Sequence, residues 1–586
     1  MSLAFLRLMG YNKGNGVWKK KLSNSRRAGE KKVPKLPIGM EDFKELIQKD
    51  YYYVDKSMFI REIMKDKVCL YTRPRRFGKT LNMSMLYYFF SNREKTGVSL
   101  FETLAISKDE EIMKHQNGYP VIFLTLKDMR EPSFESVIEA FGLLISDLIG
   151  QFEELMGSKA LNPSEVKRLN ALFRGEASVT LLGRSLQLLS LCLKKHYGKN
   201  VILLIDEYDV PLQNAYLHGY YDEMTSFLKN LFSTALKTND ALEHAVLTGC
   251  FQIAKESIFT GLNNFCVYSI LDEQGSAYFG FTQQEMDQLL NNCHLNQYRA
   301  DMKKWYNGYL FGNTEIYNPW STLMYANQLM QTSDVYARSY WANTSSNDIV
   351  YDYIRHGTQA MKDDFDTLIL GGSIKKVIKP ELTYREMDDI NNVYSFLLFS
   401  GYLRVEKRLD WNRYELMIPN YEIQTIYENL FHQWAEEIQN QSRMEFIRAL
   451  LDKDVEKANE ILNYILLQSM SYYDSQESFY HGFLMGLLAQ ESMYSNIESG
   501  DGRCDIKYLP VDKEKSGFIL ELKVCREKDL YDTAVEACQQ IVDMRYLESD
   551  YARGYRHMIG YGIAFEKKRC FIKMLAVKGK TKRKKS

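Results

Sequence analysis

Short, continuous apolar runs separated by longer amphipathic stretches organise the first half of the chain. These runs occupy residues 68–72, 120–126, 201–205 and 243–249. Runs of this length without alternating polar positions are typical of strands buried on both faces of a parallel sheet. Residues 134–152 and 181–196 repeat apolar side chains at three- and four-residue spacing, which predicts helices. The pattern predicts an α/β domain with a parallel sheet and flanking helices.

Shorter helices are expected around the first apolar run. Asp42 is a good N-cap for one of them, and residues 58–65 and 81–90 predict two more. The aromatic residues of segment 37–67 allow two interpretations, either a place in the core or a wall beside a bound ligand.

The second half of the chain has a different composition and hydrophobic pattern. Residues 300–430 are rich in Tyr, Trp and Asn, with helices expected at 318–330 and 348–356. An apolar helix at 394–403 followed by short strands predicts a helical, winged-helix-like region. Residues 444–467 are amphipathic, and we predict that they form a connector. The helix–strand–strand–helix pattern from 478 to 541 predicts a second α/β domain.

The length of 586 residues corresponds, as a prior, to about three or four domains. We expect a basic arm at residues 1–36, a first α/β domain at 37–300, the winged-helix-like region at 301–440, the connector at 441–470, the second α/β domain at 471–577 and a basic tail at 578–586.

The loop between the first apolar run and its helix contains Gly78, Lys79 and Thr80. A strand, a tight loop and a helix that opens with Gly-Lys-Thr are the layout of a phosphate-binding P-loop. Lys79 would bring its charge to the β- and γ-phosphates of ATP, and the hydroxyl of Thr80 would reach Mg²⁺. The general motif has Gly where this chain has Arg73, so a basic turn that caps an ordinary helix stays as an alternative. The expected ATP-binding residues of the loop are Arg73, Pro74, Arg75, Arg76, Phe77, Gly78, Lys79 and Thr80.

Acidic residues follow the third apolar run. Asp206 and Glu207 stand where the carboxyl end of a buried parallel strand would meet a ligand. Asp206 would bind Mg²⁺, and Glu207 would orient and activate the attacking water. Thr248 ends the fourth run, where ATPases with an additional strand place a polar residue that senses the γ-phosphate. The alternative is a strand that ends in a solvated acidic turn.

A second set of chemically suggestive residues lies near the C-terminus. Asp505 is expected to open one strand, and Glu521 and Lys523 lie two apart on the next, so that both face the same side. Asp505 and Glu521 would share Mg²⁺, with Mn²⁺ as a second candidate, and the metal would polarise a phosphodiester and activate a water. Lys523 would position that water or stabilise developing charge. The alternative is a solvated strand face with a cross-strand ion pair.

Accessory residues of this second site are expected on the neighbouring helices. Gln540, with Tyr546, fits the helix that follows the Glu-x-Lys strand in many nucleases of the PD-(D/E)XK type. An upstream acid would be Glu477 or Glu491. His481 suits either a site role or a helix-packing hydrogen bond.

The chain resembles a bacterial family of AAA-ATPase-like proteins that carry a PD-(D/E)XK nuclease-like module at the C-terminus. The resemblance extends from about residue 36 to about residue 575, and Arg73 agrees with the loop of that family. Near Gln252 the family often has a basic residue, which this chain lacks. The segments that carry the resemblance are 53–56, 73–80, 204–209, 247–249, 257–264, 278–282, 305–309, 317–320, 340–345, 500–505 and 519–524.

Composition adds three expectations. Lys+Arg and Asp+Glu are equal at 75 each, so net charge gives no information about an acidic partner. The basic segments 12–36 and 578–586 are typical of nucleic-acid-binding or merely solvated ends. Nine scattered cysteines without Cys-x-x-Cys spacing argue against zinc and suit reduced thiols in a cytoplasm. The sequence shows no signal peptide and no apolar run of about 18 residues, so we expect no membrane association.

The favoured hypothesis is an ATP-binding and ATP-hydrolysing protein coupled to a metal-dependent nuclease that cleaves DNA, with RNA not excluded. The domain pairing implied by the resemblance is consistent with defence against mobile DNA. The alternative is an ATP-driven switch whose C-terminal module binds nucleic acid or protein without cleavage. A structural protein with an inactive P-loop is a third reading. Arg75 and Arg76 are candidates for transition-state charge or for pairing with loop acids, and an arginine acting between subunits would require a homo-oligomer.

Overall fold

The computed structural model describes residues 34–94, 100–252, 259, 265–332, 335–341, 358–389, 392–469, 477–488, 493–526 and 528–575. The chain divides into two compact units, residues 1–428 and 429–586, which are described separately. Most of the basic arm, all of the basic tail and the expected helix 348–356 lie outside the described residues.

A parallel sheet forms the centre of the N-terminal unit, with the described strands in the order β2-β3-β4-β1-β5. The strands are β1 (Val68–Thr72), β2 (Val121–Thr125), β3 (Val201–Asp206), β4 (Leu242–Gly249) and β5 (Phe265–Tyr268). Val246 of β4 pairs with Cys69 of β1 on one side and with Leu204 of β3 on the other. An additional strand therefore separates the strand before the phosphate loop from the strand that ends in Asp206.

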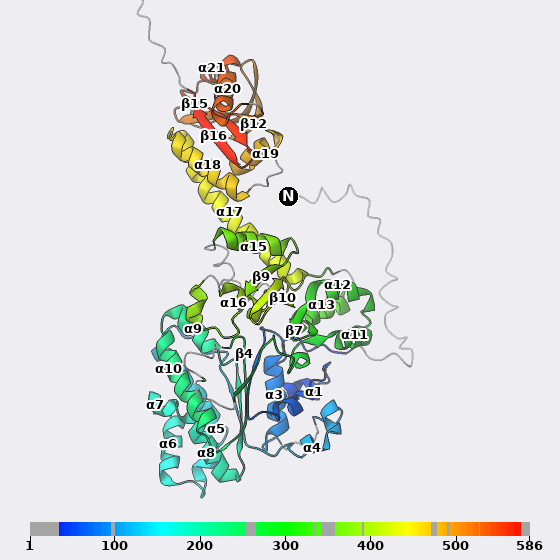
Figure 1. The fold of residues 1–586 in the computed structure, drawn as a ribbon. Helices are drawn as coiled ribbons and strands as arrows, with labels where there is room; N and C mark the ends of the chain where they lie inside the picture. Colours follow the sequence, from blue (N-terminus) through cyan, green and yellow to red (C-terminus); the bar gives the residue numbers. More distant parts are fainter. Residues whose placement is uncertain are drawn as a thin grey trace, which may run out of the picture. The chain divides into compact units, whose positions relative to one another are not determined.

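Helices cover both faces of this sheet, with α1 and α3 on one face and α5 and α8 on the other (Figure 1). The described helices of this part are α1 (Phe43–Gln48), α2 (Phe59–Ile63), α3 (Lys79–Phe90), α4 (Glu110–Met113), α5 (Phe134–Gly150), α6 (Pro163–Phe173), α7 (Val179–Leu182), α8 (Ser185–Tyr197), α9 (Val210–His218) and α10 (Tyr221–Phe232). Asp42 caps α1 as expected, accepting a hydrogen bond from Glu45 N at 2.7 Å. The predicted α/β class is confirmed.

The rest of the N-terminal unit contains two small antiparallel sheets, ordered β6-β8-β7 and β10-β11-β9 in the described chain. Their strands are β6 (Phe281–Thr282), β7 (Tyr309–Phe311), β8 (Thr314–Tyr317), β9 (Ile374–Val377), β10 (Arg404–Arg408) and β11 (Arg413–Met417). The accompanying helices are α11 (Gln283–Asn292), α12 (Arg299–Tyr306), α13 (Pro319–Gln331), α15 (Gln359–Ile369), α16 (Val393–Ser400) and α17 (Tyr421–Leu451). The apolar helix followed by a strand hairpin agrees with the winged-helix-like expectation, to which the structure adds β9.

One acidic side chain of this region is fully buried. Glu422, in the first turn of α17, accepts hydrogen bonds from Tyr340 N at 2.7 Å, Trp341 N at 3.1 Å and Ser321 Oγ at 2.9 Å. Burial raises the pKa of Glu422 to about 7, although these three hydrogen bonds work in the opposite direction.

A pH-dependent stability follows from this shift. The carboxyl of Glu422 binds its proton more tightly in the native state than in the unfolded state. Its contribution to the free energy of unfolding is therefore complete below about pH 4.5 and is lost as the pH rises towards 7. We expect Glu422 to account for a fall of about 3 kcal/mol in unfolding free energy between pH 5 and pH 8. Unfolding midpoints of the full chain, measured across this range, should fall less in Glu422→Gln than in the wild type. Parallel curves would contradict the expectation, and Glu428→Gln in the same helix is the matched control.

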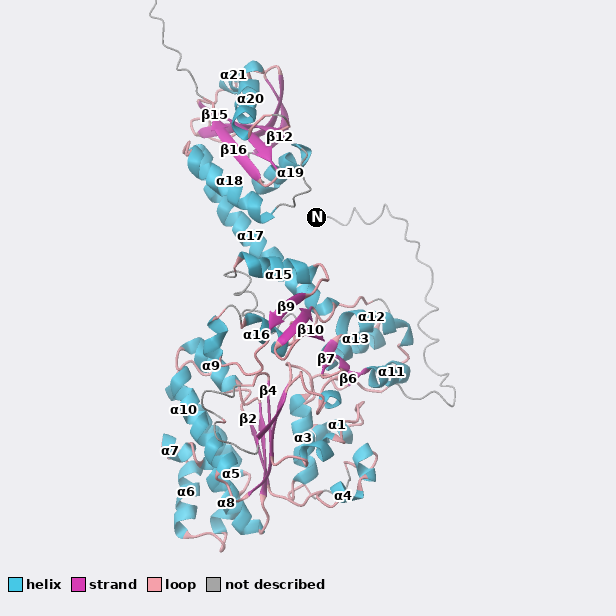
Figure 2. Ribbon diagram, viewed as in Figure 1, coloured by secondary structure: helices cyan, strands magenta, loops and turns pink. Residues whose placement is uncertain are grey.

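The C-terminal unit is built on a mixed sheet with the described strands in the order β12-β13-β14-β15-β16. The strands are β12 (Met493–Ser499), β13 (Gly502–Tyr508), β14 (Ser516–Val524), β15 (His557–Glu566) and β16 (Arg569–Met574), and the helices are α18 (Val455–Ser469), α19 (Glu477–Leu488), α20 (Leu530–Asp543) and α21 (Tyr546–Ala552). β14 and β15 are parallel and are connected through α20, while the neighbouring pairs are antiparallel. Figure 2 shows the helices packed around this sheet.

Two details of the C-terminal unit differ from the sequence-based expectations. Asp505 lies inside β13 and does not open it, because the strand begins at Gly502, directly after a turn. The expected connector 441–470 packs into the core, where Leu462 and Ile465 of α18 are buried together with strand residues of the sheet. Its apolar stripe, which suggested an amphipathic connector, faces this core.

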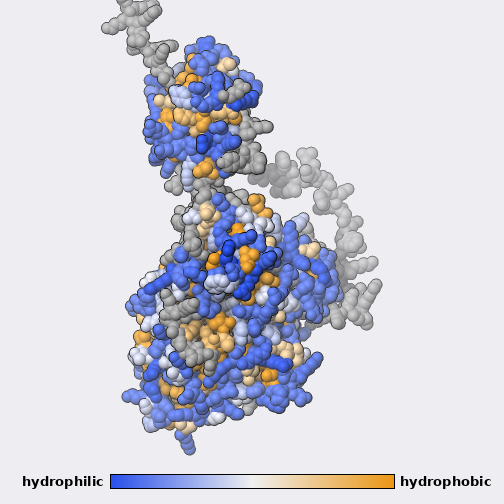
Figure 3. Space-filling view, in the orientation of Figure 1, coloured by the Kyte–Doolittle hydropathy of each residue, from blue (hydrophilic) through white to orange (hydrophobic). Residues whose placement is uncertain are grey.

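No helix of the described residues is long and apolar enough to cross a membrane. The face drawn in Figure 3 is mostly hydrophilic, with smaller apolar areas between polar ones.

Candidate functional site

The phosphate loop of the N-terminal unit connects β1 to α3. Gly78, with φ of +82°, precedes the first residue of α3, and a Cβ would meet no atom there, so glycine serves the left-handed backbone. The Lys79 side chain folds back across the loop and donates from Nζ to the carbonyl oxygens of Arg73 at 3.1 Å and Pro74 at 3.0 Å. The lysine charge is therefore buried at the centre of the loop, beside the helix N-terminus that favours an anion.

Asp206 joins three parts of the chain in this site. Thr80 Oγ1, from the first turn of α3, donates to Asp206 Oδ2 at 2.7 Å, and Thr248 Oγ1 at the end of β4 donates to Asp206 Oδ1. Glu207 N in turn donates to Thr248 Oγ1 at 3.4 Å. Burial raises the pKa of Asp206, and the two threonine hydroxyls oppose that rise. The structure thus brings together Lys79, Thr80, Asp206, Glu207 and Thr248, as the sequence predicts.

The oxygen donors of this cluster fit Mg²⁺. The ion prefers hard oxygen ligands and keeps part of its water shell when it binds beside a nucleotide phosphate. A hydroxyl from Thr80 and a carboxylate from Asp206, 2.7 Å apart, supply such ligands at one place.

The remaining residues of the loop contact separate parts of the N-terminal unit. Arg73 is fully buried and donates to the backbone carbonyl of Tyr268 at 2.8 Å, so a phosphate would meet its backbone and not its side chain. Pro74 does not line the cavity. Arg75, Arg76 and Phe77 do line it. Arg75 donates to Gln213 Oε1 at 2.8 Å, and Arg76 donates to the carbonyl of Tyr340 at 2.9 Å.

A cavity of about 620 Å³ opens on the phosphate loop, within the size range of small-molecule sites. Loop residues 75–80 and Glu207 line this cavity, together with Pro37, residues 52–54 and Trp320. Segment 37–67 therefore contributes a wall of this cavity as well as core residues such as Phe43 and Phe59, so both sequence-based readings apply to it.

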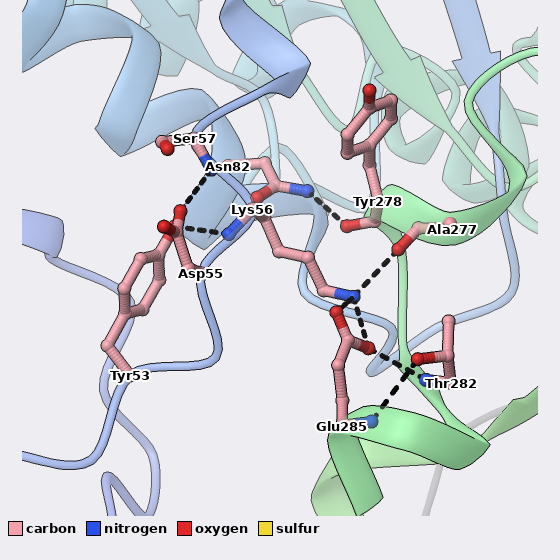
Figure 4. A network of polar contacts seen from close by, with 9 residues as sticks. All are labelled: Tyr53, Asp55, Lys56, Ser57, Asn82, Ala277, Tyr278, Thr282 and Glu285. Carbon is pink, nitrogen blue, oxygen red and sulfur yellow. Dashed lines mark hydrogen bonds and ion pairs between the residues drawn. The ribbon is translucent and has the colours of Figure 1, made fainter. Parts of the chain in front are cut away.

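A polar network holds that wall in place (Figure 4). Lys56 Nζ pairs with Glu285 at 2.6 Å and donates to the carbonyl of Ala277 at 2.7 Å. Asn82 of α3 donates to the carbonyl of Tyr278 at 2.9 Å. Because the charge of Lys56 is matched by Glu285, this lysine supports the wall and does not act as a second phosphate-binding cation. Sequence analysis did not find this pair, because its members are 229 positions apart in the chain.

Asp209 is a further residue of the site that sequence reasoning did not assign. It is buried, and Oδ2 accepts hydrogen bonds from Cys250 N at 2.8 Å and Phe251 N at 3.1 Å. It therefore fastens the chain after β4 to the chain after β3. A Cβ on Gly249 would lie 2.6 Å from the Tyr208 ring and 2.8 Å from Asp209 Oδ1, so glycine is needed for this close approach.

In the C-terminal unit, β13 and β14 separate where the second set of candidate residues lies. Their backbone pairing ends at Ile506 and Leu520, and beyond it Leu522 N donates to Asp505 Oδ2 at 2.8 Å. The Asp505 carboxylate thus fills the gap between the two strands. Burial raises the pKa of Asp505, while its hydrogen bond with Leu522 N and the charges of His481 and Lys523 lower it.

Glu521, the residue before Leu522 on β14, meets Gln540 of α20. Gln540 Nε2 donates to Glu521 Oε1, and Glu521 itself is buried. Helix α20 reaches this position because it crosses β15 closely: a Cβ on Gly562 would lie 2.3 Å from the carbonyl oxygen of Ala534. The structure brings Asp505, Glu521, Lys523 and Gln540 to adjacent positions on β13, β14 and α20, as the sequence predicts.

Two carboxylates are available for a metal here. Asp505 and Glu521 supply the hard oxygen ligands of Mg²⁺, which proteins often hold with one or two carboxylates together with substrate phosphate oxygens. In the part of the chain that the structure describes, no group of three or more His, Cys, Asp or Glu side chains could hold a metal. The Glu477 side chain and Glu491, the candidates for an upstream acid, lie outside the described residues.

The remaining neighbours of this opening have structural contacts. His481 Nε2 lies 3.1 Å from the carbonyl oxygen of Asp505, and Tyr546 donates from its hydroxyl to the carbonyl of Arg503 at 2.6 Å. Lys507, two residues beyond Asp505, forms a fully buried ion pair with Asp550 at 2.8 Å. These contacts fix β13 between α19 and α21.

Residues 37–259 match a family model described as "Predicted AAA-ATPase", and residues 475–574 match a model described as "PD-(D/E)XK nuclease superfamily". The chain therefore has an AAA-ATPase-like region followed by a PD-(D/E)XK nuclease superfamily region, and the predicted domain architecture is confirmed. One relative, described as "Uncharacterized protein in vnfD 5'region" from Azotobacter chroococcum mcd 1, is 28% identical over 404 residues, covering 66% of this chain and 68% of the relative.

Proposed function

We propose that the N-terminal unit binds and hydrolyses ATP. The observation that carries this proposal is the meeting of Thr80, Asp206 and Thr248, which joins the phosphate loop, the acidic strand end and the additional strand in one contact. The backbone N–H groups of the loop would cradle the phosphates, and Lys79 would compensate their charge. Glu207 would orient the attacking water, and Thr80 with Asp206 would hold Mg²⁺, which neutralises charge on the phosphate oxygens.

Thr248 provides a discriminating test of this arrangement. Its hydroxyl donates to Asp206 and accepts from Glu207 N, so valine, which has the same shape without the hydroxyl, breaks both contacts. We expect Thr248→Val to reduce ATP hydrolysis by about tenfold to a hundredfold, and Thr248→Ser to retain most of it. Steady-state phosphate release measures the effect. Equal rates in the two variants would contradict the sensing role of Thr248.

We propose further that the C-terminal unit cleaves a phosphodiester bond of nucleic acid, with DNA as the favoured substrate. The adjacent Asp505, Glu521, Lys523 and Gln540 support this proposal. Asp505 and Glu521 would hold Mg²⁺ or Mn²⁺, which polarises the phosphodiester and lowers the pKa of a bound water. Gln540 orients the Glu521 carboxylate through its hydrogen bond, and Lys523 would position the water or stabilise developing charge.

The cleavage proposal is tested by incubating the full chain with Mg²⁺ or Mn²⁺ and linear, circular and single-stranded DNA and RNA. Metal-dependent cleavage of DNA supports it. Cleavage of RNA alone would change the substrate class, and binding without cleavage of any substrate would favour an ATP-driven switch whose C-terminal unit is a binding module.

We also propose a biological role, a cellular compartment and an oligomeric state for the protein. The pairing of the two regions in one chain supports a nuclease controlled by nucleotide, in defence against mobile DNA, although fold-level analogy is the ground for that role. All nine cysteines are free thiols, which supports a reducing compartment such as the cytoplasm. A homo-oligomer would allow an arginine of one subunit to act at the phosphates of another.

A further inference from the structure

Arg76 occupies an unusual backbone position in the phosphate loop. Its φ is +67°, a left-handed conformation that is strained for a residue with a side chain unless neighbouring contacts hold it. Two contacts do so. Arg76 Nη1 donates to the carbonyl of Tyr340 at 2.9 Å, and the guanidinium lies 4.8 Å from the ring centroid of Trp320. The conformation of the loop therefore depends on the segment around Tyr340.

Glu422 holds that segment from the other side. The peptide N–H of Tyr340 and that of Trp341 both donate to Glu422 Oε1. The carbonyl oxygen of Tyr340 thus accepts a hydrogen bond from the positive Arg76, while the N–H of Tyr340 donates one to the negative or partly protonated Glu422. Hydrogen bonds arranged in such a chain between opposite charges polarise and strengthen one another. The second oxygen, Oε2, is buried and has no hydrogen-bond partner among the described residues, so all the hydrogen bonds given for the carboxyl converge on Oε1, two from this peptide segment and one from Ser321 Oγ.

Packing around the segment leaves little room for adjustment. The Trp341 ring stacks on Tyr402 with ring centroids 5.5 Å apart. A Cβ on Gly401 would lie 2.8 Å from the Trp341 ring and 3.0 Å from Pro74 of the phosphate loop. Gly401 has φ of +92°, which also favours glycine. The loop, the Tyr340–Trp341 segment and the end of α16 are therefore in tight contact.

We propose that Glu422 is a positioning residue of the nucleotide site: through the backbone of Tyr340 and Trp341 it holds Arg76, and with it the phosphate loop, in the binding conformation. The inference rests on the proposed ATP site. Coupling between two sites is reciprocal, so phosphate bound at the loop would also stabilise the first turn of α17.

The experiment compares Glu422→Gln with Glu428→Gln, which makes the same chemical change in the same helix, where Glu428 bonds to Gln424. Backbone hydrogen exchange of residues 74–82 is measured in the nucleotide-free full chain, and ATP affinity is measured by equilibrium titration. We expect loop exchange to be about tenfold faster and ATP affinity about tenfold weaker in Glu422→Gln. The reason is that the series of hydrogen bonds from Arg76 through Tyr340 then ends on a neutral amide and no longer on a carboxylate. Glu428→Gln should match the wild type in both measurements.

A double-variant cycle separates this role from a general loss of packing. In an Arg76→Ala background, Glu422→Gln should add little to loop exchange, because the hydrogen bond that links the loop to Tyr340 is already lost. Should Glu422→Gln fail to fold, Ser321→Ala, which removes one donor to the carboxyl, gives a milder test with the same expected direction. Equal exchange in Glu422→Gln and Glu428→Gln, or full additivity with Arg76→Ala, would overturn the inference. Faster exchange in a chain that binds no ATP would support the positioning role and overturn the proposed nucleotide instead.

Discussion

Replacing Lys523 by alanine is expected to reduce the rate of phosphodiester cleavage by about a hundredfold to a thousandfold. Lys523 follows Glu521 by two residues on β14, and its charge acts on the Asp505 carboxyl across the opening between the strands. Loss of one preorganised group that stabilises charge in a transition state has an effect of this size. Cleavage of labelled DNA under single-turnover conditions measures it, while ATP hydrolysis should be unchanged.

Lys515→Ala is the matched control for this variant, because Lys515 is exposed in the turn just before β14. It removes the same charge from the same unit and should cleave at the wild-type rate. Glu521→Gln, nearly identical in shape, should also slow cleavage strongly and should bind Mg²⁺ more weakly. Retained cleavage in Lys523→Ala would show that another group performs this role.

Replacing Lys79 by alanine is expected to reduce kcat/KM for ATP by about a hundredfold to a thousandfold. Lys79 is buried at the centre of the phosphate loop, within 3.1 Å of the carbonyl oxygens of Arg73 and Pro74, and its charge is placed to compensate that of the phosphates. Phosphate release over a range of ATP concentrations separates the effect on affinity from that on turnover.

The control for Lys79→Ala is Lys114→Ala, which removes an exposed lysine directly after α4 in the same unit. It should hydrolyse ATP as the wild type does. If Lys79→Ala retained full activity, the chemistry would have to be assigned to another part of the chain. Loss of folding can be distinguished from loss of chemistry by the unfolding midpoint of each variant.

The parts of the fold that were predictable from sequence are those with a strong local pattern. The runs that became β1 to β4 are almost continuously apolar because both faces of the sheet are covered. β5 was missed because its residues Phe265–Tyr268 are only half-buried at the sheet edge. β9 was missed because Ile374–Val377 carries two lysines in its middle, so its pattern is that of an exposed strand.

The candidate sites were predictable where chemistry and position coincide in a short motif. Thr80 was assigned from the Gly-Lys-Thr motif, Asp206 and Thr248 were assigned from strand ends, and the structure brings the three together. Long-range contacts were not accessible in this way. No local signal shows that Arg73 is buried against backbone carbonyls, or that Glu422 lies behind the loop through the Tyr340–Trp341 segment. Such roles depend on the tertiary arrangement of residues far apart in the chain.

The most direct test of the central claim is the DNA cleavage rate of the full chain with and without ATP, in the wild type, Lys79→Ala and Lys523→Ala. A nuclease controlled by the nucleotide site predicts a rate that changes with ATP in the wild type, that no longer responds to ATP in Lys79→Ala and that is lost in Lys523→Ala. Cleavage that survives in Lys523→Ala, or that responds to ATP equally in Lys79→Ala and the wild type, would contradict it.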